Sequence, residues 1–219
     1  WKRAKGYFDV TTWAVDGTNN QTINHNLGVI PEMVWSKNTN DSSNNSGDWW
    51  VGHDGMTGWD GANENDRHAI KLNKNFASSQ QGYHRDFTTT SINLRGSATA
   101  GTVGNKLIAY LFATLDGISK VGSYTGTGSH DTHVIDCGFS NGARFVLLKR
   151  TDAQSDWFVW DSARGITNSA DPRLSLNTTA AEYNGLDDIR PHASGFIAAN
   201  PNGSDVNANG SEWIFYAIA

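Results

Sequence analysis

An internal repeat limits what this 219-residue chain can fold into more than any other feature of its sequence. Blocks of the first half recur in order in the second: 31–37 with 143–149, 47–51 with 155–159, 72–73 with 176–177, 96–97 with 203–204, and 107–113 with 213–219. Lys149 follows Lys37 by 112 residues, whereas Ala219 follows Ala113 by only 106. Matched blocks separated by loops of variable length indicate a duplicated unit. We therefore predict two copies, residues 1–116 and 117–219, with enlarged loops in the first.

Short apolar stretches in each copy predict about seven β-strands. They are rich in β-branched and aromatic residues and are bounded by Gly, Asn, Asp and Pro. No stretch sustains the apolar spacing of a helix, and only residues 180–183 resemble a helical turn. About seven strands in ~100 residues are typical of a sandwich. The predicted fold is all-β, with two tandem homologous antiparallel β-sandwich units that arose by internal duplication.

Charge and cysteine content exclude several classes of protein. The net charge is -5, and Lys and Arg are scattered, so neither a basic face nor a nucleic-acid partner is expected. No apolar run approaches the ~18 residues of a membrane span, so no membrane insertion is expected. Cys137 is the one cysteine, which rules out an intrachain disulfide. Its apolar neighbours predict a buried thiol. Because the sequence begins with Trp, we expect a longer parent polypeptide.

The sequence contains no convincing catalytic constellation. Asp54 and Asp60, like Asp187 and Asp188, lie in Gly- and Asn-rich loops without an apolar pocket to raise a carboxyl pKa. There is no Gly-x-Ser-x-Gly motif and no dinucleotide or P-loop motif. Clusters of Asp, Asn and Gly lack the ligand spacing of an EF-hand and are interpreted as solvated turns. The chain is therefore predicted to be no enzyme, with no cofactor and no metal.

The tryptophans predict which side chains form the core and which one lies on a surface loop. Trp49 and Trp157 occupy matching places in the two copies, so both are predicted to be buried core residues. Trp59 has no counterpart in the second copy and lies on a loop rich in Gly and Asp. Two hypotheses remain for Trp59: it stacks on a sugar ring, or it contacts another subunit.

The loops that differ most between the copies are the predicted recognition surface. They span residues 38–48 and 53–66 of the first copy. On a duplicated scaffold, function usually lies in variable loops rather than in shared strands. Asn63, Asn65 and Asp66 are predicted to be hydrogen-bond partners for sugar hydroxyls beside Trp59.

Five strings of the sequence carry a resemblance to a known family. Residues 2–10, 25–33, 110–114, 117–128 and 160–165 resemble a tandem β-rich module of uncharacterised tailed-phage proteins, especially of cyanophages. That module lies near the C-terminal part of tail-fibre or other virion structural proteins. Lys5 departs from the resemblance, because Pro is expected there, and so does the Asn- and Ser-rich loop 38–48.

The resemblance implies a virion structural protein, made in the host cytoplasm, that serves as a tail-fibre or receptor-binding module and contacts the host surface. The implied partners are other virion subunits, a host surface glycan and further copies of the chain, with a trimer favoured. Two alternatives remain open. One is a carbohydrate-binding or accessory module of a secreted carbohydrate-active enzyme, and the other is an extracellular filament or adhesin subunit.

Overall fold

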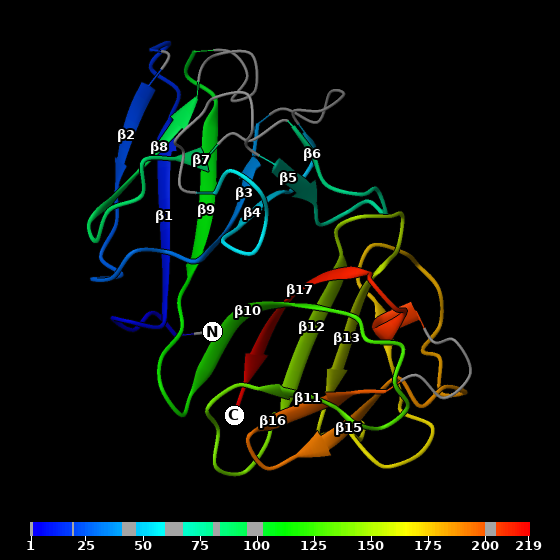
Figure 1. Cartoon of the computed structure of the whole chain (residues 1–219). Coiled ribbons are helices and arrows are strands. Elements are labelled where there is room, and N and C mark those ends of the chain that lie inside the picture. The colour runs from blue at the N-terminus through cyan, green and yellow to red at the C-terminus, as the bar shows by residue number, and fades with distance from the viewer. Residues whose placement is uncertain are drawn as a thin grey trace. The chain divides into compact units, whose positions relative to one another are not determined.

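The protein is all-β, as the sequence predicts. The computed structural model describes residues 2–18, 20–40, 47–59, 68–80, 84–95, 103–199 and 205–219. These residues form strands β1 to β17 and a short 3-10 helix, Asp205–Asn207. The chain divides into two compact units (Figure 1). The first comprises Trp1–Asn73 and Ser78–Thr114, and the second Lys74–Ala77 and Leu115–Ala219.

The first unit consists of two antiparallel sheets. Its larger sheet has the order β1 (Phe8–Ala14), β9 (Lys106–Phe112), β3 (Met33–Asn38), β4 (Trp50–His53), β5 (His68–Lys71) and β6 (Ser79–Gln80). Its smaller sheet has the order β2 (Asn20–Asn24), β8 (Ser91–Arg95) and β7 (His84–Arg85). Every neighbouring pair in these sheets is antiparallel.

The second unit has the same plan. Its larger sheet has the order β10 (Ser119–Thr125), β17 (Glu212–Ile218), β12 (Phe145–Arg150), β13 (Trp157–Asp161) and β14 (Leu174–Ser175). Its smaller sheet has the order β11 (His133–Asp136), β16 (Gly195–Ala198) and β15 (Ile189–His192). Each of these strands corresponds to one of the first unit at the same place in its sheet. Where the first unit has β6, the described part of the second has an isolated antiparallel bridge between Arg173 and Tyr183.

The matched sequence blocks lie on corresponding strands. Residues 31–37 lead into and form β3, and residues 143–149 do the same for β12. Residues 107–113 and 213–219 likewise form most of β9 and β17. The two units thus repeat one strand order. That this repeat arose by duplication remains a prediction.

Each unit encloses a core between its two sheets. Side chains alternate between the two faces of a strand, so Val146 and Leu148 of β12 point toward the smaller sheet. There they join Ile135 of β11 and Phe196 of β16 in one buried cluster. In the first unit, the cluster consists of Ile23, Leu27, Val34, Ile92, Ala109, Leu111 and Ala113. This two-sheet arrangement gives each unit the form of a sandwich.

Three short strands were not predicted, and one predicted helical turn is wrong. Strands β6, β7 and β15 were not predicted, because the first two are very short and polar, and β15 contains Pro191. Since β15 lies at the edge of its sheet, its proline is tolerated there. The helical turn expected at residues 180–183 is wrong: Tyr183 instead pairs with Arg173 in an isolated antiparallel bridge.

Candidate functional site: a polar cleft in the second unit

Trp59, the predicted sugar-stacking residue, uses one face of its ring within the protein. The indole stacks on Phe87 with ring centroids 4.0 Å apart and planes at 15°. It is partly buried and packs against the core cluster of the first unit. Asn63, Asn65 and Asp66, its predicted hydrogen-bonding partners, lie outside the described residues.

The two tryptophans expected in the core differ in burial. Trp157 is 1% exposed at the start of β13, whereas Trp49 is only partly buried, contrary to the expectation. The residue that follows is buried in both units, Trp50 in the first and Phe158 in the second. The ring of Trp49 lies 5.8 Å from that of Tyr110.

The same pair of polar residues fixes the start of the fourth strand in both units. In the second unit, Trp157 N–H donates to Asn177 Oδ1 at 2.8 Å, and Asn177 Nδ2 donates to Asp156 Oδ1 at 2.8 Å. In the first, Trp49 N–H donates to Asn73 Oδ1 at 3.0 Å, and Asn73 Nδ2 donates to Asp48 Oδ1 at 2.7 Å. We call these contacts the Asp–Asn pair of each unit.

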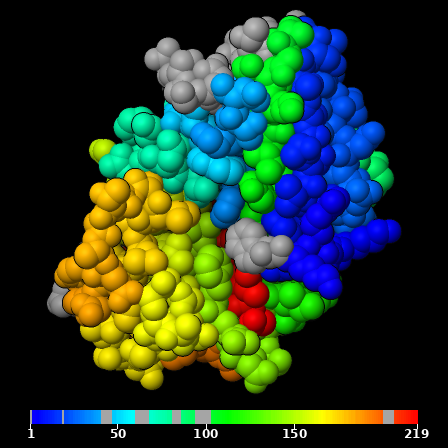
Figure 2. Space-filling model, turned by 180° about the vertical axis from the view of Figure 1, so that it is seen from behind, coloured from blue at the N-terminus to red at the C-terminus, as the bar shows by residue number. Residues whose placement is uncertain are grey.

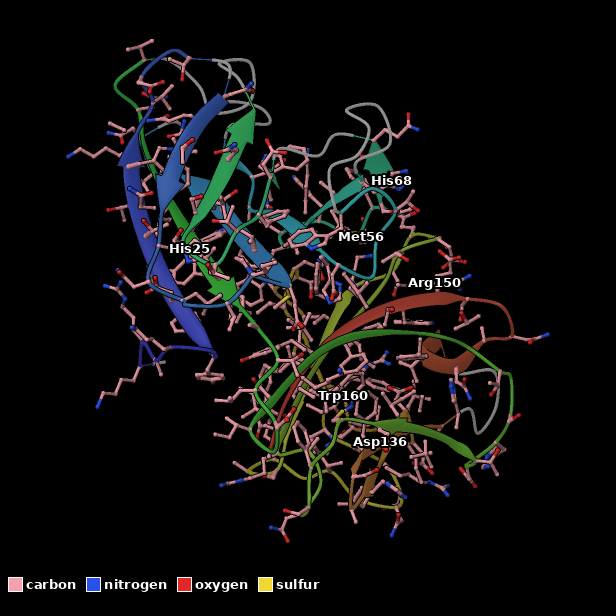
Figure 3. The ribbon with its side chains drawn as sticks, turned by 60° about the vertical axis from the view of Figure 1, so that its left-hand side comes forward. His25, Met56, His68, Asp136, Arg150 and Trp160 are labelled. Carbon is pink, nitrogen blue, oxygen red and sulfur yellow. The ribbon has the colours of Figure 1, made fainter. Side chains whose placement is uncertain are left out.

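Beside the second Asp–Asn pair lies an open polar cleft of about 360 Å³. That volume falls in the range of about 300–1,000 Å³ typical of small-ligand sites. Its polar lining comes from Asn75, Arg150, Gln154, Ser155, Asp156 and Arg173. Phe158 completes the lining. Arg150 is the last residue of β12. Figure 3 shows Arg150 at some distance from Trp160, whose side chain belongs to the buried core of the unit.

A buried lysine holds the walls of the cleft together. Lys149 is wholly buried, and its Nζ donates to the backbone carbonyls of Ser155 at 2.7 Å, Arg150 at 3.0 Å and Asn75 at 3.5 Å. Burial lowers the pKa of Lys149 to about 8, although the nearby carboxylate of Asp156 opposes that shift. All three carbonyls belong to residues that line the cleft, so Lys149 sets its shape from beneath.

The arginines of the cleft are paired with carboxylates. Arg150 donates to both oxygens of Asp152, at 2.8 and 3.0 Å, and this hydrogen bonding lowers the pKa of Asp152. Arg173 donates to Asp188 at 2.5 Å, and its guanidinium lies 4.2 Å above the ring of Phe158. Two-point pairing and stacking fix a guanidinium more firmly than a single contact does.

The connection between β13 and β15 contributes Arg173 and contains several further acids. Much of the yellow-to-orange surface in Figure 2 belongs to this connection. Asp187 and Asp188, which the sequence places in a loop without an apolar pocket, form ion pairs with Arg190 and Arg173. Asp188 is wholly buried, which the sequence does not indicate.

Asp171 on the same connection is 1% exposed. Its Oδ1 accepts hydrogen bonds from Thr167 N–H at 2.7 Å and Thr167 Oγ1 at 3.2 Å. Burial raises the pKa of Asp171 to about 6, and the charge of Asp187 adds to that effect. This carboxyl does not line the cleft.

The described residues include neither a cluster of metal-ligating side chains nor a helix that could span a membrane. No three or more His, Cys, Asp or Glu side chains of that part of the chain are grouped to hold a metal ion. Nor does the described part include a helix long and apolar enough to cross a membrane.

These observations define a protein of two all-β units with a polar loop cleft in the second. The chain belongs to the family described as a domain of unknown function, DUF7483, whose model matches residues 3–219. Comparison with curated proteins and with solved structures gives no significant match.

Proposed function

We propose that this chain is a structural component of a tailed-phage virion, a tail-fibre or receptor-binding module that contacts the host surface and is not an enzyme. The observation that carries the proposal is the cleft of the second unit. Its hydrogen-bonding side chains are fixed by ion pairs and by the Asp–Asn pair. Such prearranged polar groups favour recognition of a polar surface ligand, because little ordering is needed on binding.

The carboxyl groups of the cleft favour binding over hydrolysis. Glycosidases typically place two carboxyl groups on either side of the bond to be broken. Asp156 is the one carboxylate among the described residues that line the cleft, and its Oδ1 is occupied by Asn177. A recognition role requires no second carboxyl group, so this lining supports attachment.

The alternatives differ from the proposal mainly in where the protein would be found. An accessory module of a carbohydrate-active enzyme, or an adhesin subunit, would use the same cleft on a secreted enzyme or on a bacterial surface. The cellular or virion location therefore separates these hypotheses better than a binding assay does.

The experiment is immunogold electron microscopy with antibodies raised against this chain. We expect gold on the tail or fibres of intact particles produced from the parent genome. We also expect the purified chain to compete with those particles for adsorption to host cells. Particles without label, together with label on secreted enzyme or on the surface of uninfected bacteria, would contradict the proposal.

A further inference from the structure

We infer that the cleft of the second unit is a binding site for a neutral saccharide. The inference rests on the proposed function only for the source of that saccharide, a glycan of the host surface. The site differs from the loop of Trp59, where sequence reasoning placed recognition.

The cleft offers both donors and acceptors that the protein itself leaves unused. Among the described residues, no partner is present for Nε and Nη2 of Arg173, for Oδ2 of Asp156, or for the side-chain amides of Gln154 and Asn75. Guanidinium groups donate, carboxylates accept, and amides do both. Sugar hydroxyls also donate and accept, so neighbouring hydroxyls of one ring match this mixed set.

The most important of these groups are held in place before a ligand arrives. Arg173 is bonded to Asp188, and its guanidinium lies 4.2 Å from the ring of Phe158 and 5.5 Å from that of Tyr183. Asp156 is held by Asn177. A ligand therefore meets fixed hydrogen-bonding directions, which give specificity for the positions of the hydroxyls.

The charges of the cleft balance, which argues for a neutral ligand. Arg150 is paired with Asp152, and Arg173 with Asp188. The third cation, Lys149, lies near the carboxylate of Asp156. An anionic group such as phosphate or sulfate gains most where cationic side chains are in excess, and no such excess exists among these groups.

Exposed aromatic rings accompany the polar lining. Tyr183, which contacts Arg173, is 49% exposed, and Phe76, which follows Asn75 in the chain, is 56% exposed. The face of an aromatic ring packs against the C–H groups of a pyranose ring, which complements hydrogen bonding to its hydroxyls.

The test is a glycan array probed with the full chain, on which neutral and acidic glycans are both represented. We expect neutral glycans to bind. Calorimetry with the best neutral glycan then measures the effect of two substitutions at exposed side chains, Gln154→Ala and Tyr183→Ala. Each is expected to weaken binding by about fivefold or more, the loss of one hydrogen bond or one packing contact.

Two matched variants serve as controls. Asn141→Ala removes an exposed amide of the same unit that does not line the cleft, and it should leave affinity unchanged. Tyr183→Phe keeps the ring and should keep most of the affinity if stacking is its contribution. Thermal unfolding of every variant checks that the fold is retained.

The outcomes separate this inference from the proposed function. Exclusive binding of acidic glycans, no glycan binding, or neutral binding lost in Trp59→Ala but kept in Gln154→Ala and Tyr183→Ala would each overturn the inference. If the chain blocks particle adsorption without any cleft dependence, the proposed function stands and the inference falls. If the cleft binds neutral glycans but antibodies do not label particles, the inference stands and the proposed function falls.

Discussion

Burying the ammonium group of Lys149 costs free energy, yet the folded state depends on the hydrogen bonds that this group donates. Its ammonium group is taken out of water, yet three backbone carbonyls accept hydrogen bonds from it. Lys149→Met would fill similar space but leave those carbonyls without their hydrogen-bond donor. We expect a loss of about 2–4 kcal/mol in the free energy of unfolding, measured by urea denaturation. Lys120→Met, at a partly exposed lysine of the same unit, should change it by less than about 0.5 kcal/mol.

Asp171 predicts a pH dependence of stability. Its pKa is about 6 in the folded protein, against an ordinary value of 3.8, so the folded state binds the proton more tightly. The contribution of this carboxyl is therefore fully present below about pH 4 and is lost as pH rises through 6. Asp171→Asn keeps the acceptor for Thr167 and removes the charge. Relative to the unmodified chain, this variant should gain about 1–3 kcal/mol between pH 4 and pH 7 in denaturation experiments. A difference that stays constant over this range would contradict the assignment.

Cys137 is expected to be chemically inert while the protein is folded. It is 4% exposed, and burial raises the pKa of its thiol to about 12. Because the thiolate is the reactive form, alkylation by iodoacetamide at pH 8 should be at least about a hundredfold slower than in denaturant. Equal labelling rates in the two conditions would show that the thiol is accessible.

At the scale of elements, the Asp–Asn pairs connect strands that are far apart in sequence. Asn177 joins the start of β13 to the residues after β14, and Asn73 does the same for β4 and β5. Asn177→Ala or Asn73→Ala would each remove two hydrogen bonds and should cost about 1–3 kcal/mol of unfolding free energy. Asn141→Ala, in an exposed turn, is the matched control and should have little effect. Equal stability of all three variants would show that the pairs contribute nothing.

Most of the elements could be predicted because their residues carry a local pattern. The blocks that form β12, β13 and β17 are apolar runs of strand-forming residues, and their matches in the first half reinforced the assignment. Strand β15 and the bridge at Tyr183 depend on partners elsewhere in the chain and have no such pattern. Trp49 shows a further limit: it occupies the same place as Trp157, yet the repeat does not indicate that it is less buried.

The cleft could not be predicted for the same reason. Its lining comes from residue 75, residues 150–158 and residue 173, which are brought together only by the fold. No motif distinguishes Gln154 or Arg173 in the sequence. The sequence around Asp156 predicts a strand with core aromatics, which describes Trp157 correctly but gives no indication of a neighbouring cleft.

At the scale of the whole molecule, one strand plan carries two different surfaces. Where β12 ends in Arg150, the corresponding strand β3 ends in Asn38. Where Arg173 lies over Phe158 in the second unit, Lys71 lies 4.5 Å from the ring of Trp50 in the first. The shared strands thus hold different polar side chains at similar places. It remains a prediction that loops 38–48 and 53–66 of the first unit form a recognition surface.

The surplus of aromatic and exposed apolar side chains predicts self-association. The chain has 9 Trp, 9 Phe and 6 Tyr, more than two small cores require, and Ile118 and Val134 of the second unit are 47% and 41% exposed. The resemblance to tail-fibre modules favours a trimer, and sedimentation equilibrium should show a concentration-dependent approach to about three times 23.8 kDa.

Ile118→Asp or Val134→Asp should shift the equilibrium toward the monomer if that residue lies in the interface. Lys120→Met introduces no charge into an apolar surface and should leave the equilibrium between monomer and oligomer unchanged. A single species of 23.8 kDa at every concentration would contradict the prediction for this chain.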